Sequence, residues 1–176
     1  TDWRELIEIQ LVALVPLDFW NSYEGKELAL KVASARGYLG GVLVPPFDDF
    51  TEANLLHLLS LAEKLQCPID LHIDECDKYP AAGIKLLLKV LQHTNINVPI
   101  TCSHASSMSL LGKRELIIIS EKFLNFDISV IALPLTNSWL LNKKRRETPL
   151  VRPVAPIRQL QKAGVQVAIG GDNVND

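Results

Sequence analysis

Short apolar segments alternate with longer amphipathic segments along the whole chain. The short segments are rich in Val, Ile and Leu, which predicts six β-strands opening near residues 10, 41, 69, 98, 128 and 165. The longer segments carry apolar residues at helical spacing, which predicts five helices over residues 25–35, 52–65, 81–92, 110–123 and 154–163. Repeated strand–helix units with apolar strands predict an α/β fold in which helices cover a parallel sheet.

Local signals mark the ends of several elements. Thr51 is expected to cap the helix that follows it, and Gly37 is expected to stop the helix that precedes it. The helix over 110–123 contains three consecutive isoleucines, whose strand propensity competes with the helical period. The residues around Asn137 and Trp139 are predicted to form a loop.

The polar ends of the strands help to choose between two parallel architectures. Three predicted strands run into His72, His104 and Asp172, and Glu75 follows shortly after His72. The units fit either an open doubly wound sheet or part of a (β/α)8 barrel, which normally needs roughly 250 residues. An open sheet gathers polar strand ends mainly at one switch point, whereas a barrel gathers all of them around one mouth. The strand ends therefore favour an incomplete (β/α)8 barrel.

Composition and charge narrow the range of functions. The 176 residues fit one domain spanning 1–176, and 48% hydrophobic residues indicate a filled core rather than disorder. A net charge of −2 implies no nucleic-acid partner and no membrane surface. No apolar run approaches the roughly 18 residues needed to cross a bilayer. The three cysteines show no paired spacing, which indicates reduced thiols and predicts a cytoplasmic protein.

The residue types at the strand ends suit metal chemistry. Two imidazoles and a carboxylate, from His72, His104 and Asp172, are ligands that zinc and iron accept. A metal so held lowers the pKa of bound water toward about 7, and Glu75 could carry a proton to the substrate. Alternatively, the histidines are hydrogen-bonded structural residues and Asp172 caps a turn. The spacing of these residues leaves both interpretations open.

Four short motifs occur in an order that resembles a known family. They are HIDE at 72–75, TCSHAS at 101–106, LPLTN at 133–137 and GGDNVND at 170–176. Over nearly its whole length the chain resembles the cytosine deaminase branch of the metal-dependent amidohydrolase superfamily. The resemblance implies a (β/α)8 barrel of amidohydrolase type, of which this chain would hold about six parallel strands, the third to the eighth. It also implies metal-dependent hydrolytic deamination of an aminated heterocycle, most directly cytosine to uracil and ammonia.

The resemblance also implies a role for each residue at the strand ends. His72 and Asp172 would bind one divalent metal ion, zinc or iron, which activates water as hydroxide. His104 would hold and polarise that water. Asp172 would accept its proton, and Glu75 would carry a proton to the pyrimidine ring nitrogen.

The substrate-binding positions depart from the family pattern. Leu17 follows Pro16 where the family places a pyrimidine-binding glutamine, and Asn173 stands where an aspartate often occurs. Asn137 and Trp139 are also expected to line the substrate pocket. Losing an amide that pairs with the ring edge weakens discrimination among amino-azines. Cytosine and other small aminated heterocycles are therefore the expected substrates.

A further departure concerns the first metal-binding motif. The family carries a His-x-His motif on its first strand, whereas this sequence has none and its earliest histidine is His57. The chain is therefore expected to be a fragment that is inactive by itself. Uncovered sheet edges favour self-association, so a homo-oligomer is expected. The alternatives are an amidohydrolase that acts on another C–N bond, and a barrel fragment with no assembled site.

Overall fold

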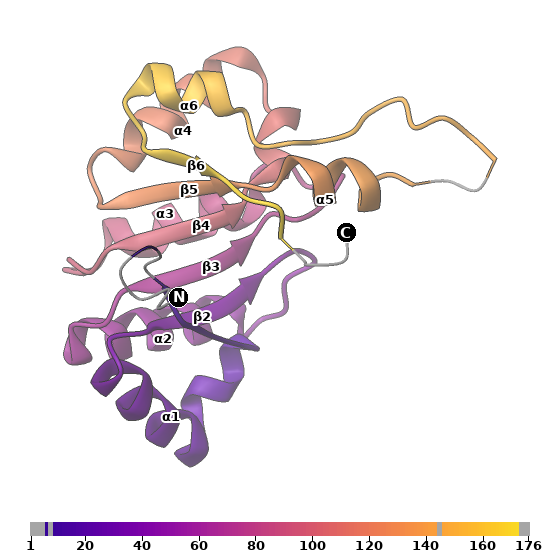
Figure 1. Cartoon of the computed structure of the whole chain (residues 1–176). Helices are drawn as coiled ribbons and strands as arrows, with labels where there is room; N and C mark the ends of the chain where they lie inside the picture. Colours follow the sequence, from indigo (N-terminus) through magenta and orange to yellow (C-terminus); the bar gives the residue numbers. More distant parts are fainter. Residues whose placement is uncertain (1–5, 7–8, 144–145, 173–176) are drawn as a thin grey trace.

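The computed structural model describes residue 6 and residues 9–143 and 146–172, and it shows a single parallel sheet within them. The spatial order of the strands follows their order in the sequence (Figure 1). The strands are β1 (Val12–Val15), β2 (Tyr38–Leu43), β3 (Ile69–Ile73), β4 (Ile100–His104), β5 (Ile128–Ala132) and β6 (Val167–Ile169). This order excludes a doubly wound sheet, because such a sheet reverses its strand order at a switch point.

Helices cover one face of the sheet, with α2 and α3 behind the strands in Figure 1. The α-helices are α1 (Tyr23–Ser34), α2 (Thr51–Leu65), α3 (Ala82–Gln92), α4 (Lys113–Phe123), α5 (Pro134–Leu140) and α6 (Ile157–Ala163). Two 3-10 helices, η2 (Leu17–Asn21) and η3 (Ser106–Leu110), follow β1 and β4. The short helix α5 lies beyond the carboxyl ends of the strands. No helix in the described ranges is long and apolar enough to cross a membrane.

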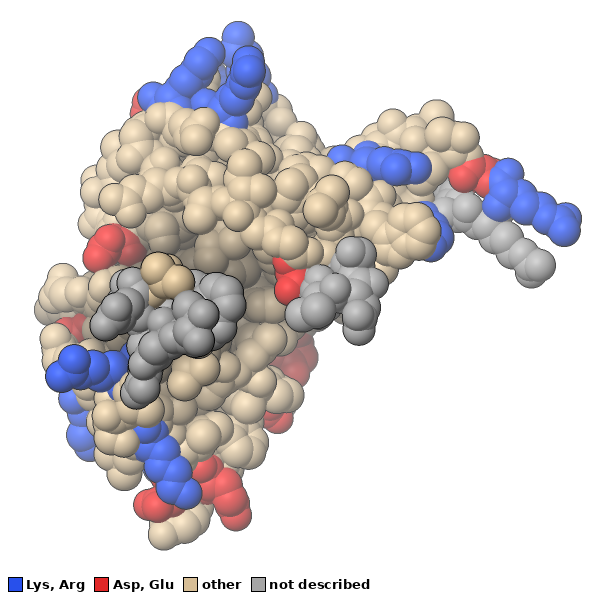
Figure 2. Space-filling model, viewed as in Figure 1, with Lys and Arg blue, Asp and Glu red and all other residues tan. Residues whose placement is uncertain are grey.

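The opposite face of the sheet is open within the described residues. Val12, Leu14 and Val42 point to this face and are 36%, 41% and 45% exposed. The part of the face that is visible in Figure 2 carries mostly uncharged residues. In the described part of the chain β1 and β6 do not pair, so the sheet is not closed. The predicted α/β fold, an incomplete (β/α)8 barrel, is confirmed.

Successive side chains of β3 point alternately into the core beneath the helices and to the opposite face of the sheet. Ile69, Leu71 and Ile73 are fully buried on the face that the helices cover. Burying each such side chain contributes roughly 1.5–3 kcal/mol to stability. Because successive side chains of a strand point to opposite faces, Asp70 and His72 point to the other face. The apolar residues of β3 thus anchor the strand that presents His72.

Two expected helix signals act differently from the prediction. Thr51 was expected to cap α2, but its hydroxyl donates to Asp48 Oδ1 at 2.6 Å, so it closes the preceding turn instead. Gly37 was expected to stop α1, but Arg36 takes the left-handed conformation, with φ 55°. Gly37 N–H then donates to the Val32 carbonyl at 2.9 Å. The predicted cap at Thr51 was therefore wrong. The helix α1 does end just before Arg36 and Gly37 as predicted, but Arg36 rather than the glycine takes the left-handed conformation.

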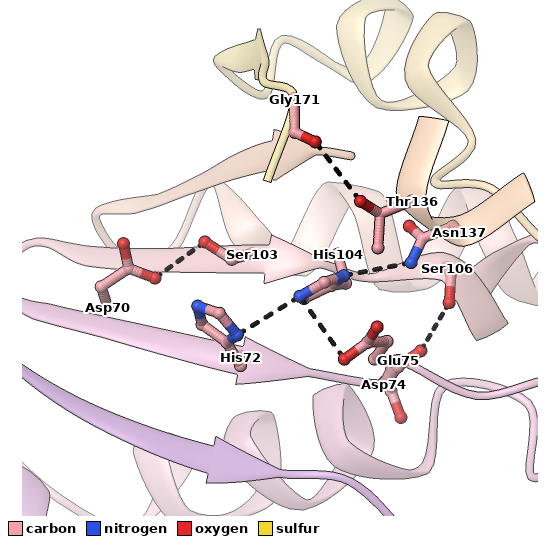
Figure 3. A network of polar contacts seen from close by, with 10 residues as sticks. All are labelled: Asp70, His72, Asp74, Glu75, Ser103, His104, Ser106, Thr136, Asn137 and Gly171. Carbon is pink, nitrogen blue, oxygen red and sulfur yellow. Dashed lines mark hydrogen bonds and ion pairs between the residues drawn. The ribbon is translucent and has the colours of Figure 1, made fainter. Parts of the chain in front are cut away.

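The predicted loop around Asn137 and Trp139 was also wrong, because these residues lie in α5. Pro134 occupies the first turn of this helix. Proline suits that position because its fixed φ matches the helix and its missing N–H would have no helical partner there. The helix directs Asn137 toward the carboxyl ends of the strands (Figure 3).

Candidate active site

His104 ends β4 and lies at the centre of a polar cluster at the carboxyl edge of the sheet (Figure 3). Its Nε2 lies 3.3 Å from His72 Nδ1 and 3.6 Å from Glu75 Oε2. Its Nδ1 lies 3.0 Å from Asn137 Nδ2. The two imidazoles meet edge to face, with ring centroids 4.9 Å apart. The buried His104 side chain therefore contacts residues of β3, of the loop after β3, and of α5.

The backbone at the end of β4 turns His104 toward His72. In the β3–β4 register His72 pairs with Ser103, and Ile73 pairs with His104. Strict alternation would place His104 with Cys102 on the face that the helices cover. His104 instead has φ 73°, a left-handed conformation that costs on the order of 1–3 kcal/mol in a residue other than glycine. This backbone conformation lets the imidazole contact His72.

Asp74 fixes the loop that carries Glu75. The Asp74 carboxylate is fully buried and accepts hydrogen bonds from the N–H groups of Gly83 at 2.8 Å and Ile84 at 2.9 Å, at the start of α3. Its carbonyl oxygen accepts a hydrogen bond from Ser106 Oγ at 2.8 Å. Burial raises the pKa of Asp74, and the two backbone hydrogen bonds oppose that shift. The loop is thereby held between β3, α3 and η3, with Glu75 facing His104.

Asp172 reaches the same cluster from beyond β6. Ligand atoms of Glu75, His104 and Asp172 all lie within 4.8 Å of one another. Thr136 Oγ1 of α5 donates to the carbonyl of Gly171 at 3.3 Å, which ties the segment before Asp172 to that helix. Imidazole nitrogens and carboxylate oxygens are ligands that zinc and iron accept. The donor atoms of Glu75, His104 and Asp172 therefore fit a divalent metal ion, and His72 lies against His104 from β3.

The environment of His104 favours its neutral form. The pKa of His104 is lowered to about 4, chiefly by burial and also by the nearby His72, while Asp172 opposes the shift. A neutral imidazole has one N–H donor and one acceptor nitrogen. Its hydrogen-bond partners therefore decide which nitrogen faces the site as a donor.

A second buried pair lies on the same face and was not predicted. Ser103 Oγ donates to Asp70 Oδ1 at 2.8 Å, and both residues are buried. Burial raises the pKa of Asp70, while the Ser103 hydrogen bond and the charge of His72 lower it. Asp70 precedes His72 by two positions, so the alternation of β3 could have indicated that the two residues share a face.

The residues predicted to bind substrate occupy different environments. Asn137 is fully buried within the polar cluster, whereas Trp139 is 63% exposed on α5. Lys143 Nζ lies 3.8 Å from the centroid of the Trp139 ring. Leu17 belongs to the core and lines a cavity of about 440 Å³ beside the carboxyl ends of β1 and β2. Asn173 lies outside the described residues.

Solved structures of two hydrolases share this fold. A 5-methylcytosine deaminase from Klebsiella pneumoniae, liganded with 5-fluorocytosine, superposes with a TM-score of 0.77 and 24% identity, over 99% of this chain and 43% of that chain. An N-isopropylammelide isopropylaminohydrolase from Burkholderia multivorans gives a TM-score of 0.72 and 23% identity, over 99% of this chain and 41% of that chain. At these identities the likeness establishes the fold.

A curated protein is related to the chain in sequence. The chain is 30% identical over 177 residues to a pterin deaminase of Rhizobium rhizogenes, covering 99% of this chain and 40% of that protein. The predicted relationship to the amidohydrolase superfamily is confirmed. No model of a known protein family matches the chain. The chain thus spans two fifths of the curated relative that it matches.

Proposed function

We propose that the whole protein deaminates an aminated heterocycle by metal-dependent hydrolysis. The observation that carries this proposal is the convergence of His72, Glu75 and Asp172 around His104 at one edge of the sheet. The similarity to a pterin deaminase supports the same class of reaction. Since the chain covers 40% of that relative, the proposed activity is that of the whole protein.

His72 and Asp172 are the residues of this chain that would hold the metal ion, zinc or iron. When bound, such an ion supplies a nucleophile from water at neutral pH. The arrangement supports these two ligands because both lie beside His104, one from β3 and one from beyond β6. His104 would then orient the water through a hydrogen bond.

The carboxylates would move the protons. Hydrolytic deamination adds water to the ring carbon that bears the amino group, breaks the exocyclic C–N bond and releases ammonia. Asp172 would accept a proton from the attacking water, and Glu75 would deliver a proton to the neighbouring ring nitrogen. The Glu75 carboxylate lies 3.6 Å from His104 Nε2, so it faces the space in which the water would be held.

The proposed substrates are amino-substituted pyrimidines and fused pyrimidines. Cytosine is the first candidate, and pterin is added because the sequence relative is a pterin deaminase. Leu17 brings no amide to pair with a ring edge, which favours a broad range of aminated rings. The cytoplasmic location, the homo-oligomer and the choice between zinc and iron stay predictions.

The proposal is tested with the purified whole protein. Metal content is measured by elemental analysis, and ammonia release is measured with cytosine, 5-methylcytosine, pterin and guanine. We expect about one divalent ion per subunit and ammonia release from at least one ring. A protein that binds metal but releases no ammonia from any of them would instead favour hydrolysis of another C–N bond. A protein that binds no metal would overturn the proposal.

A further inference from the structure

The amide of Asn137 contacts the nitrogen of His104 that faces away from the proposed substrate. Asn137 is fully buried in α5, and its Nδ2 lies 3.0 Å from His104 Nδ1. Among the described residues, its Oδ1 has no hydrogen-bond partner. The other ring nitrogen, Nε2, faces His72 and Glu75. Asn137 therefore contacts the ring nitrogen opposite to the one that faces His72 and Glu75.

The direction of the Asn137 amide follows from the donors and acceptors around it. An amide turned by 180° would accept from His104 Nδ1 and would leave an NH2 group buried without a partner. The observed direction leaves only the carbonyl oxygen unpaired. Buried N–H groups without a partner are rarer than buried carbonyl oxygens without one. The amide therefore donates to Nδ1.

A neutral imidazole that accepts at Nδ1 must carry its proton on Nε2. Figure 3 shows that His104 Nε2 faces both His72 and Glu75, so a proton on this nitrogen points toward them. A protonated nitrogen has no free lone pair for a metal ion, so this tautomer makes His104 a donor to bound water rather than a metal ligand. In the structure His72 Nδ1, 3.3 Å from His104 Nε2, is then the acceptor of this N–H.

We propose that Asn137 is a positioning residue that holds His104 in the Nε2–H tautomer. It does so from α5 by donating its amide N–H to Nδ1. Fixing the tautomer from outside the site is a known use of second-layer hydrogen bonds to catalytic histidines. The consequence for catalysis rests on the proposed deaminase function, whereas the tautomer itself does not.

Nuclear magnetic resonance of the metal-free whole protein, labelled with ¹⁵N in its histidines, tests the tautomer directly. A His104→Gln variant assigns the His104 signals. We expect a protonated Nε2 and an unprotonated Nδ1 in the wild type. In Asn137→Asp the carboxylate can only accept, so the proton should move to Nδ1. A wild-type His104 that is protonated at Nδ1, or a tautomer unchanged in Asn137→Asp, would overturn the proposal.

Kinetics test the consequence for catalysis. Asn137→Asp and Asn137→Leu should each lower kcat by about 10²–10⁴-fold, the range for a misplaced proton donor, while KM and metal content stay within about twofold. Leu140→Ala, on the exposed side of the same helix, is the matched control and should leave kcat, KM and metal content unchanged.

If Asn137→Leu does not fold, Asn137→Asp, which has nearly the same shape, still decides the question. An active wild type with unchanged kcat in Asn137→Asp would overturn the inference alone, whereas an inactive, metal-free wild type would overturn the proposed function.

Discussion

The N–H of Gly83 donates to the Asp74 carboxylate at 2.8 Å and joins the end of β3 to the start of α3. A Cβ atom added at Gly83 would lie 2.7 Å from the Leu43 carbonyl oxygen and 2.8 Å from a side-chain carbon of Ile73. No side chain therefore fits at the point where this hydrogen bond forms. The close contact fixes both ends of the loop that carries Glu75.

Replacing Gly83 should destabilise the chain. Gly83→Ala places a methyl group against backbone and core, and we expect a loss of about 1–3 kcal/mol in the free energy of unfolding. Urea unfolding followed by circular dichroism measures the change. Gly171→Ala is the control, because no atom of the described residues lies within 4 Å of a Cβ added there. A loss at Gly83 no larger than that at Gly171 would contradict the packing argument.

Glu75 and His72 should respond differently to substitution in the whole protein. Glu75→Gln keeps the shape but removes the proton carrier, so we expect kcat to fall by about 10²–10⁴-fold with the metal retained. His72→Gln should instead lose the metal, because it removes a proposed ligand. Elemental analysis and steady-state kinetics distinguish the two effects. Loss of metal from Glu75→Gln would show that Glu75 is a ligand, as its place near His104 and Asp172 also permits.

Removing the Ser103 hydroxyl should destabilise the chain, because the buried Asp70 carboxylate loses a hydrogen bond. Ser103→Ala takes away a 2.8 Å hydrogen bond to a buried carboxylate, and we expect a loss of about 1.5–3 kcal/mol in unfolding free energy. Ser34→Ala is the control, since its hydroxyl bonds an exposed carbonyl at a helix end. In an Asp70→Asn background the effect of Ser103→Ala should shrink, because no buried charge remains. An undiminished loss in that background would indicate that Ser103 acts through packing.

The three cysteines should differ in reactivity toward a thiol reagent. Cys67 and Cys102 are buried, whereas Cys76 is partly exposed. Burial raises the pKa of all three thiols, so each has less reactive thiolate at pH 8 than a free cysteine. In the native chain we expect Cys76 to react first, more slowly than free cysteine, and the other two to react after unfolding in urea. Immediate reaction of all three would show that the core opens readily.

Periodicity along the sequence was enough to predict the six strands and the helices that alternate with them. In β3, Ile69 and Leu71 alternate with Asp70 and His72, and the apolar residues are the ones beneath the helices. Burial of apolar side chains is a strong and nearly additive effect, so a local pattern records it well. The order of polar strand ends also predicted which residues approach one another. The prediction failed for α5, whose short helix depends on Pro134 and on its packing.

The sequence by itself determined the strand–helix units and the set of His, Glu and Asp residues at the strand ends. Only the tertiary structure decided that the His104 side chain departs from the alternating directions of β4. It also decided that Asn137 of α5 contacts His104 Nδ1. Local propensity acts between neighbours in the chain, whereas a left-handed residue and a buried side-chain hydrogen bond are stabilised by segments far apart in sequence.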